Sequence, residues 1–181
     1  MIRVVAGTAR GLLIEAPASD ARPTLNRARE ALFSILHSRI EGARFADFFA
    51  GSGANGIEAL SRGAEYCAFV DSDTRAIHTI GRNLFHTKLG HKARSYQLTL
   101  PQSLGVIATK EARFDIVFCD PPFEGVDYEA LLSQIAEKKL VTTGGVLVVE
   151  HEDPTELPQA VGGLTRGRVA QYGRVAFSFY T

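Results

Sequence analysis

The chain has 181 residues, of which 45% are hydrophobic and 22% charged, and its 20 basic and 20 acidic residues leave no net charge. This length and composition predict one globular domain with a substantial core. They argue against a protein that coats nucleic acid, a membrane-spanning protein and a secreted one, so we expect a cytoplasmic protein that has no membrane partner but can still carry local basic patches.

The N-terminal segment alternates apolar and polar residues on both sides of a glycine-containing turn, Gly7 to Gly11. This pattern predicts two short strands joined by the turn. A loop is predicted from Pro17 to Pro23, and Thr24 is predicted to cap a helix over about residues 25–40.

Arg29 falls on the apolar face of that helix. A cation on a core-facing stripe needs a partner, because a buried unpaired charge is costly. Two interpretations stay open. Arg29 is either a structural residue, through an ion pair or a snorkelling side chain, or a residue near an active site that faces a carboxylate or a phosphate.

From Arg44 onward, apolar runs alternate with amphipathic segments. The runs predict strands over residues 45–49, 66–70, 94–98, 116–119 and 146–149. Helices are predicted after the first run, over 74–89 and over 128–140, and Gly144 and Gly145 predict a turn before the strand over 146–149. The last two runs, 168–172 and 175–180, predict a hairpin around Gly173. This order predicts an α/β fold with a mostly parallel sheet, helices on both faces and an antiparallel edge.

A glycine-rich turn follows the first of these strands. Gly51 to Gly56 fits the pattern G-x-G-x-x-G, whose glycines let a ligand lie against bare backbone at a helix N-terminus. Asp71 stands about 20 residues further on, where an acidic residue binds ribose hydroxyls. A nicotinamide cofactor needs room for a pyrophosphate. Asp47, ahead of the glycines, instead suits a cofactor whose near end carries an ammonium, such as S-adenosylmethionine.

A stiff turn, Asp120 to Phe123, follows the strand over 116–119, since its two prolines fix φ and remove two backbone donors. The Asp120 carboxylate and the Pro121 carbonyl can accept hydrogen bonds from an exocyclic amine, and Phe123 can stack on its ring. Alone, the motif also fits an ordinary loop with a stacking aromatic residue. Together with the glycine turn it favours methyl transfer to an amino nitrogen, catalysed mainly by positioning, on a base taken out of a helix or loop.

The stretch DFFAGSGANG, Asp71 and DPPF resemble class I methyltransferases that act on amino nitrogens. RVVAGTARG (3–11), RPTLNRAREALFSIL (22–36) and YGRVAFSFY (172–180) are similar to the RsmD-type 16S ribosomal RNA guanine-N2 methyltransferases, and the similarity covers nearly the whole chain. The resemblance implies a Rossmann-like class I fold over a single domain, 1–181. Its sheet is seven-stranded, and an RNA-contacting hairpin-plus-helix extension over 1–41 precedes the catalytic core over 42–181.

The resemblance also implies the activity: transfer of a methyl group from S-adenosylmethionine to guanine N2 in 16S rRNA, within a 30S particle or an assembly intermediate, by a monomer that needs no metal. The catalytic residues it implies are Asp120, Pro121, Pro122 and Phe123. The cofactor-binding residues it implies are Asp47, Ala50, Gly51, Ser52, Gly53, Asn55, Gly56, Asp71, Ser72 and Thr99. The RNA-binding residues it implies are Arg3, Arg10, Arg22, Arg27 and Arg29.

Thr99 is a departure from the family, which usually has an acidic or amide residue there to meet the adenine amine. Thr99 or a backbone group must serve instead. Cys67 and Cys119 lie in apolar runs and predict buried thiols in a reducing compartment, without a metal site.

Two alternatives remain beside the rRNA enzyme. One is an amino methyltransferase that acts on DNA adenine or on a protein side chain, although a DNA enzyme usually needs an added recognition segment. The other is a non-catalytic RNA-binding module with a retained cofactor pocket.

Overall fold

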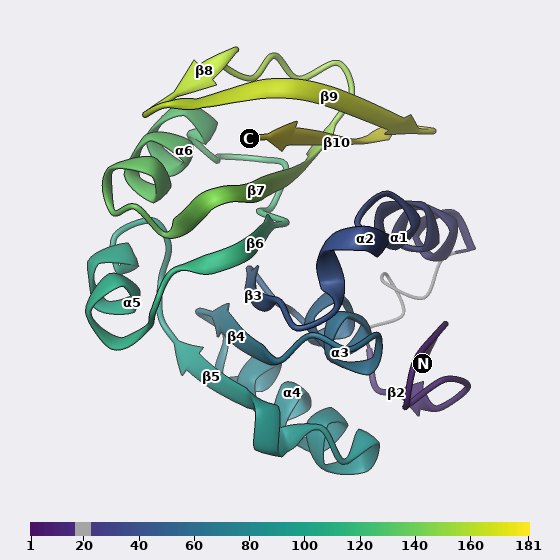
Figure 1. Cartoon of the computed structure of the whole chain (residues 1–181). Coiled ribbons are helices and arrows are strands. Elements are labelled where there is room, and N and C mark those ends of the chain that lie inside the picture. Colours follow the sequence, from purple (N-terminus) through teal and green to yellow (C-terminus); the bar gives the residue numbers. More distant parts are fainter. Residues whose placement is uncertain (17–22) are drawn as a thin grey trace.

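A computed structural model describes residues 1–16 and 23–181. Eight strands form one sheet in the order β5-β4-β3-β6-β7-β10-β9-β8 (Figure 1). The strands are β3 (Arg44–Phe48), β4 (Tyr66–Asp71), β5 (Ala93–Gln97), β6 (Phe114–Cys119), β7 (Val141–Glu152), β8 (Ala160–Val161), β9 (Leu164–Tyr172) and β10 (Val175–Tyr180). The first five are parallel, and the last three continue the sheet antiparallel. The predicted seven strands are present, and the short β8 extends the antiparallel edge.

Helices cover both faces of the sheet (Figure 1). The helices are α1 (Pro23–Ile35), α2 (His37–Ile40), α3 (Ala54–Ser61), α4 (Thr74–Thr87), the 3₁₀ turn η2 (Gly90–Lys92), α5 (Leu104–Lys110) and α6 (Tyr128–Glu137). The first four α-helices pack with one core cluster, which includes Phe45, Phe69 and Phe118. The last two pack with a second cluster on the other face. The parallel strands are therefore buried on both sides, which explains their continuous apolar runs.

The alternation of side chains along the strands aligns four carboxylates. Phe45, Phe69, Phe118 and Val148 all belong to the first core cluster. Two positions further along the same four strands stand Asp47, Asp71, Asp120 and Glu150. Because the side-chain period of a strand is two, these acidic residues share one face at the carboxyl ends of neighbouring strands. The strand order changes direction between β3 and β6, and ligands bind at such a switch point.

The N-terminal strands β1 (Ile2–Arg3) and β2 (Leu13–Ile14) pair antiparallel as expected. Their hairpin is fastened to α3. The Glu58 carboxylate accepts hydrogen bonds from the backbone N–H groups of Val5 and Ala6, at 2.8 and 3.0 Å. Gly7 has φ +83°, and a β-carbon there would overlap the Ser61 carbonyl. These contacts therefore fix the position of the hairpin against α3.

Several predicted boundaries were wrong. The helix predicted over 25–40 is two helices, and Thr24 lies inside α1, which begins at Pro23. Proline fits the first helical position because its missing N–H has no intrahelical partner there. The 45–49 strand ends at Phe48, and the helix predicted to Leu89 ends at Thr87, where Lys88 has φ +59°.

On the other face, α6 ends at Glu137 instead of residue 140, and α5 was not predicted. The pair Gly144 and Gly145 was interpreted as a turn before a strand at Val146. In the structure β7 runs through this pair, and its pairing with β6 shifts register between Phe114 and Ile116. The glycines therefore mark a bulge within a strand, another structure that glycine favours.

Candidate active site

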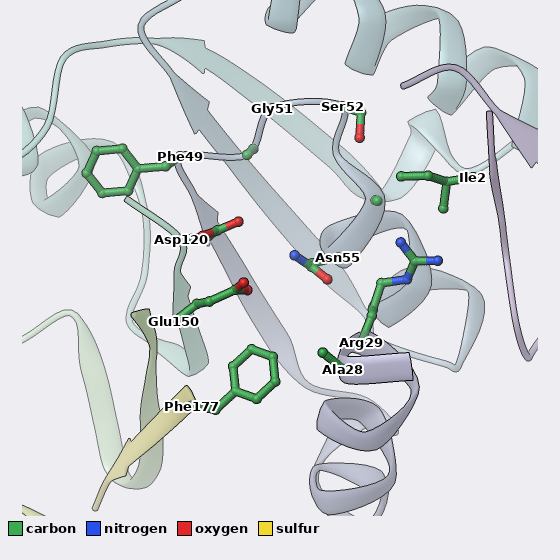
Figure 2. A pocket seen from close by; sticks show the side chains of 12 residues that line it. Ile2, Ala28, Arg29, Phe49, Gly51, Ser52, Asn55, Asp120, Glu150 and Phe177 are labelled. Carbon is green, nitrogen blue, oxygen red and sulfur yellow. The ribbon is translucent and has the colours of Figure 1, made fainter. Parts of the chain in front are cut away.

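A cavity opens at the carboxyl ends of β3, β6 and β7 and beside α1 (Figure 2). The loop after β3 contributes Phe49, Ala50, Gly51 and Ser52, and the start of α3 contributes Ala54 and Asn55. The other lining residues are Ile2, Ala28, Arg29, Asp120, Glu150 and Phe177. This is the switch point of the sheet. The glycine loop and the first residue of D-P-P-F, predicted separately from the sequence, therefore meet in one place.

Two carboxylates hold the glycine loop in shape. Asp71 Oδ2 accepts from the Gly51 N–H at 2.8 Å, and its Oδ1 accepts from the Asp73 N–H at 2.9 Å. Asp47 Oδ2 accepts from the Gly56 N–H at 2.8 Å. The hydrogen bonds from Gly51 and Gly56 each join a backbone N–H of the loop to a side chain at the end of a strand. The loop is therefore preorganised by the ends of β3 and β4.

Asp47 does not occupy the place expected for it. Its side chain is 1% exposed, and it lines neither of the two cavities that border the loop. Burial raises the pKa of Asp47 well above the ordinary value. The hydrogen bond from the Gly56 N–H lowers this pKa, and the negative charges of Asp120 and Asp71 raise it further. Asp47 therefore supports the loop from beneath instead of lining a cavity.

The second cavity lies on the other side of the glycine loop, and Gly51 and Ser52 line both cavities. It is bordered by Asp71, Asp73, Arg75, Ala76 and Thr79. Ser72 and Thr99 are both exposed and do not line it. The Thr99 carbonyl accepts from the Ser103 N–H at 3.0 Å, so this carbonyl already takes part in the turn before α5.

Of the four D-P-P-F residues, only Asp120 lines the first cavity. Its N–H donates to the Phe48 carbonyl at 3.2 Å, which ties the turn to β3. Pro121 is buried, Pro122 is exposed, and the Phe123 ring is 42% exposed. The Phe123 ring is therefore accessible from solvent, and its stacking on a base stays a prediction.

Glu150 belongs to the same cavity and was missed. Cys119 of β6 pairs with Val149 of β7, so the next residues of these parallel strands are Asp120 and Glu150. Figure 2 shows both carboxyl groups directed into the cavity. The sequence carried a signal for Glu150, because it directly follows an apolar run as Asp71 and Asp120 do.

Phe49 was also missed, and no sequence signal points to it. It has φ +62° and lines the cavity next to the glycine loop. A bulky residue rarely adopts positive φ, and such strain persists where the surroundings impose it, often at functional sites. Here the chain must turn sharply between β3 and the glycines.

Arg29 lines the cavity from α1 and is 8% exposed. Its Nη2 donates to the Arg3 carbonyl at 3.3 Å and to Asn26 Oδ1 at 3.1 Å, while its buried Nε has no hydrogen-bond partner among the described residues. Burial lowers the pKa of Arg29, and the charge of Glu58 opposes this. Of its two interpretations, the structure favours the one near an active site.

The other predicted arginines lie further out. Arg3 and Arg10 are exposed and line a groove between the hairpin and α1, which Arg29 also borders. Arg27 is exposed on α1. Arg22 lies outside the described residues. Among the residues that the structure does describe, no three His, Cys, Asp or Glu side chains gather as a metal ion would require, and no helix could cross a membrane.

We expect Glu150→Gln to stabilise the fold at neutral and mildly alkaline pH. Burial first, and then the charge of Asp120, raise the pKa of Glu150 well above 4.5. Between its unfolded and folded pKa values the folded state binds more protons, so the wild-type free energy of unfolding falls as pH rises through that interval. Glutamine cannot ionise and avoids this loss.

Urea unfolding of both proteins from pH 4 to pH 8 checks this prediction. The advantage of Glu150→Gln should shrink toward the acid end. Glu152→Gln is the control, because Glu152 lies on the same strand as Glu150 but is partly exposed and forms an ion pair with Arg174. A stability difference that stays constant across this pH range would contradict the account.

Known proteins resemble this chain over nearly its full length. The family described as Conserved hypothetical protein 95 matches residues 2–181. YlbH of Bacillus subtilis is 38% identical over 180 residues, 99% of this chain and 98% of its own. Ribosomal RNA small subunit methyltransferase D of Escherichia coli is 32% identical over 180 residues, which cover 99% of this chain and 89% of that protein. The solved structure of yhhF from Escherichia coli gives a TM-score of 0.86 at 32% identity, and the match covers 99% of this chain and 96% of that one.

Proposed function

We propose a function from one established premise: the chain belongs to the RsmD family, described as Conserved hypothetical protein 95. Its mostly parallel sheet with an antiparallel C-terminal hairpin is that of a Rossmann-like class I methyltransferase. We propose that this chain is an rRNA methyltransferase. In our proposal it acts as a cytoplasmic monomer and transfers a methyl group from S-adenosylmethionine to guanine N2 in 16S rRNA, within a 30S particle or an assembly intermediate. The observation that carries the proposal is the meeting of Asp120 with the glycine loop in one cavity.

The residues around the glycine loop fit S-adenosylmethionine. One cavity borders Asp71, whose oxygens each accept one backbone N–H and keep further acceptor capacity for ribose hydroxyls. The other borders Arg29, whose guanidinium suits the cofactor's carboxylate. This assigns Arg29 to the cofactor, in place of the RNA contact expected from the sequence. When bound, the cofactor supplies an electrophilic methyl group on a sulfonium.

The chain's own contribution is to hold the acceptor nitrogen. The Asp120 carboxylate and the Pro121 carbonyl accept hydrogen bonds from the two N2 hydrogens of guanine, which fixes the direction of the nitrogen. Asp120 also takes the proton that N2 must lose. The exposed Phe123 ring stacks on the base. Such positioning accounts for much of the rate of a transfer reaction.

The exposed Arg3, Arg10 and Arg27 are the proposed phosphate contacts. Arg3 and Arg10 line a groove that Arg29 also borders, and Arg29 in turn lines the cavity that would receive the base. Arg27 lies near the start of α1. Contacts to phosphate orient an RNA without reading its sequence. A neutral protein can therefore still hold rRNA through this local group.

We expect Arg29→Ala to weaken S-adenosylmethionine binding by about 10- to 100-fold, the effect of losing a hydrogen bond to a charged group. Isothermal titration with the cofactor alone measures it. Arg27→Ala is the matched control on the same helix, since its exposed side chain lies away from the cavity. If both variants bind the cofactor like the wild type, Arg29 does not hold the carboxylate.

Transfer of tritium from labelled S-adenosylmethionine tests the function itself. The protein should label 16S rRNA, free or in 30S particles from a strain that lacks the gene, and should leave DNA unlabelled. No incorporation by protein that binds the cofactor would reject the proposal. Incorporation into DNA or into ribosomal protein alone would favour the alternative amino methyltransferases.

A further inference from the structure

Glu150 has no part in the chemistry described so far, yet it lies in the middle of the cavity. It is 8% exposed, and it follows Val149 on β7 as Asp120 follows Cys119 on the paired strand β6. Phe177 of β10 is the residue that pairs with Glu150 of β7, and it lines the same cavity. Two carboxyl groups on neighbouring strands repel each other when both are ionised. Burying the Glu150 carboxylate beside a second carboxyl group is costly, and a ligand with two adjacent donors would offset that cost.

The Watson–Crick edge of guanine matches such a pair. Guanine presents two adjacent donors, the N2 amine and the N1–H, whereas adenine presents its amine beside a bare acceptor nitrogen. Asp120 accepts from the amine in the proposed function. A second acceptor beside it would meet the N1–H.

We propose that Glu150 is a specificity-determining residue, which accepts a hydrogen bond from the N1–H of the target guanine while Asp120 holds N2. The inference rests on the proposed function and names how that site selects its base. It is carried by the side-by-side placement in one cavity of two carboxyl groups, of which Glu150 is buried and Asp120 is partly buried.

The proton balance is consistent with this role. Burial and Asp120 raise the pKa of Glu150, so the pair retains a proton more readily than two separate carboxyl groups. A hydrogen bond donated by guanine N1–H stabilises the ionised form of Glu150, so the bound base favours a carboxylate that can only accept. In the reaction a bond forms between N2 and the methyl carbon, the bond from that carbon to sulfur breaks, and the N2 proton passes to Asp120. Glu150 holds the base and is not consumed.

The test compares guanine with 2-aminopurine, which keeps the 2-amino group but has no hydrogen on N1. Both bases are placed, in turn, at the 16S position that the wild type methylates. Rates of methyl transfer are measured for the wild type, Glu150→Gln and Glu150→Ala. The wild type should prefer guanine by about 10- to 100-fold, the value of a hydrogen bond that involves a charged group.

Both variants should lose most of this preference. The glutamine amide can accept from guanine N1–H or donate to the bare N1 of 2-aminopurine, and alanine does neither. The ratio of the two rates is taken within each variant, so a general loss of activity cancels. Glu152→Gln, which removes a carboxylate from the same strand outside the cavity, should keep the wild-type ratio.

Cofactor titration and thermal unfolding show that each variant is folded. An unchanged ratio in Glu150→Gln and Glu150→Ala, with cofactor binding intact, would overturn the inference and leave the proposed function standing. An unchanged ratio with weakened cofactor binding would also overturn it, and would assign Glu150 to the cofactor. Failure of the wild type to methylate any guanine would overturn the proposed function, and the inference with it.

Discussion

Asp120→Ala is expected to lower the rate of methyl transfer by about 10²- to 10³-fold, the usual effect of removing one preorganised polar contact to a reacting group. Asp120 is the only residue of D-P-P-F that lines the cavity, and its backbone is tied to β3. Its loss frees the acceptor nitrogen to rotate and removes the group that takes the proton. Cofactor affinity should stay within about twofold, because the proposed cofactor contacts lie elsewhere.

Single-turnover kinetics with saturating cofactor measure the rate, and isothermal titration measures the affinity. Asp120→Asn is the informative partner, because the amide keeps one acceptor oxygen but cannot take a proton, and it should fall between the wild type and alanine. Asp127→Ala, which removes the cap of α6 outside the cavity, should keep the wild-type rate. Wild-type rates in both Asp120 variants would show that the amine is held by another group.

Gly56→Ala is expected to destabilise the protein by about 1–3 kcal/mol, the range for inserting atoms into a packed core. A β-carbon at Gly56 would collide with the Phe69 ring and would stand 2.7 Å from Cys67 Sγ. Relief requires α3 to move away from β4. That movement would disturb the Gly56 N–H bond to Asp47 and the loop it holds, so cofactor binding should weaken as well.

Gly81→Ala is the matched control, because Gly81 also lies inside a helix but has no atom within 4 Å of the added carbon. Alanine should stabilise α4 by about 0.5–1 kcal/mol through its higher helix propensity. Urea unfolding of the three proteins gives both values. Equal shifts in the two variants would mean that helix propensity alone decides the effect and that the close packing at Gly56 is relaxed.

The sequence predicted those parts of the fold that depend on local patterns. Continuous apolar runs identify parallel strands because both faces are buried, and the acidic residues that end them identify the ligand edge of the sheet. The same signal was present at Glu150, but its importance depends on β7 lying next to β6, which no local pattern states. The pair Gly144 and Gly145 was misinterpreted because glycine favours both turns and bulges.

The roles of individual site residues were harder to predict because they depend on how deeply each side chain is buried. Asp47 and Asp71 look alike in the sequence, yet one lies beneath the glycine loop and the other borders a cavity. The apolar face that contains Arg29 predicted burial correctly but could not distinguish a core from a cavity wall. Phe49 was beyond prediction, since its positive φ is imposed by the turn between β3 and the glycines.

Mass spectrometry of nucleosides tests the central claim most directly. 30S particles from a strain that lacks the gene are incubated with the protein and S-adenosylmethionine, and the 16S rRNA is then digested and mapped. The account predicts N2-methylguanosine at a defined guanine, absent before incubation and absent with Asp120→Ala. A methyl group on adenine or on another atom of guanine, or an unchanged nucleoside profile with active cofactor-bound protein, would contradict it.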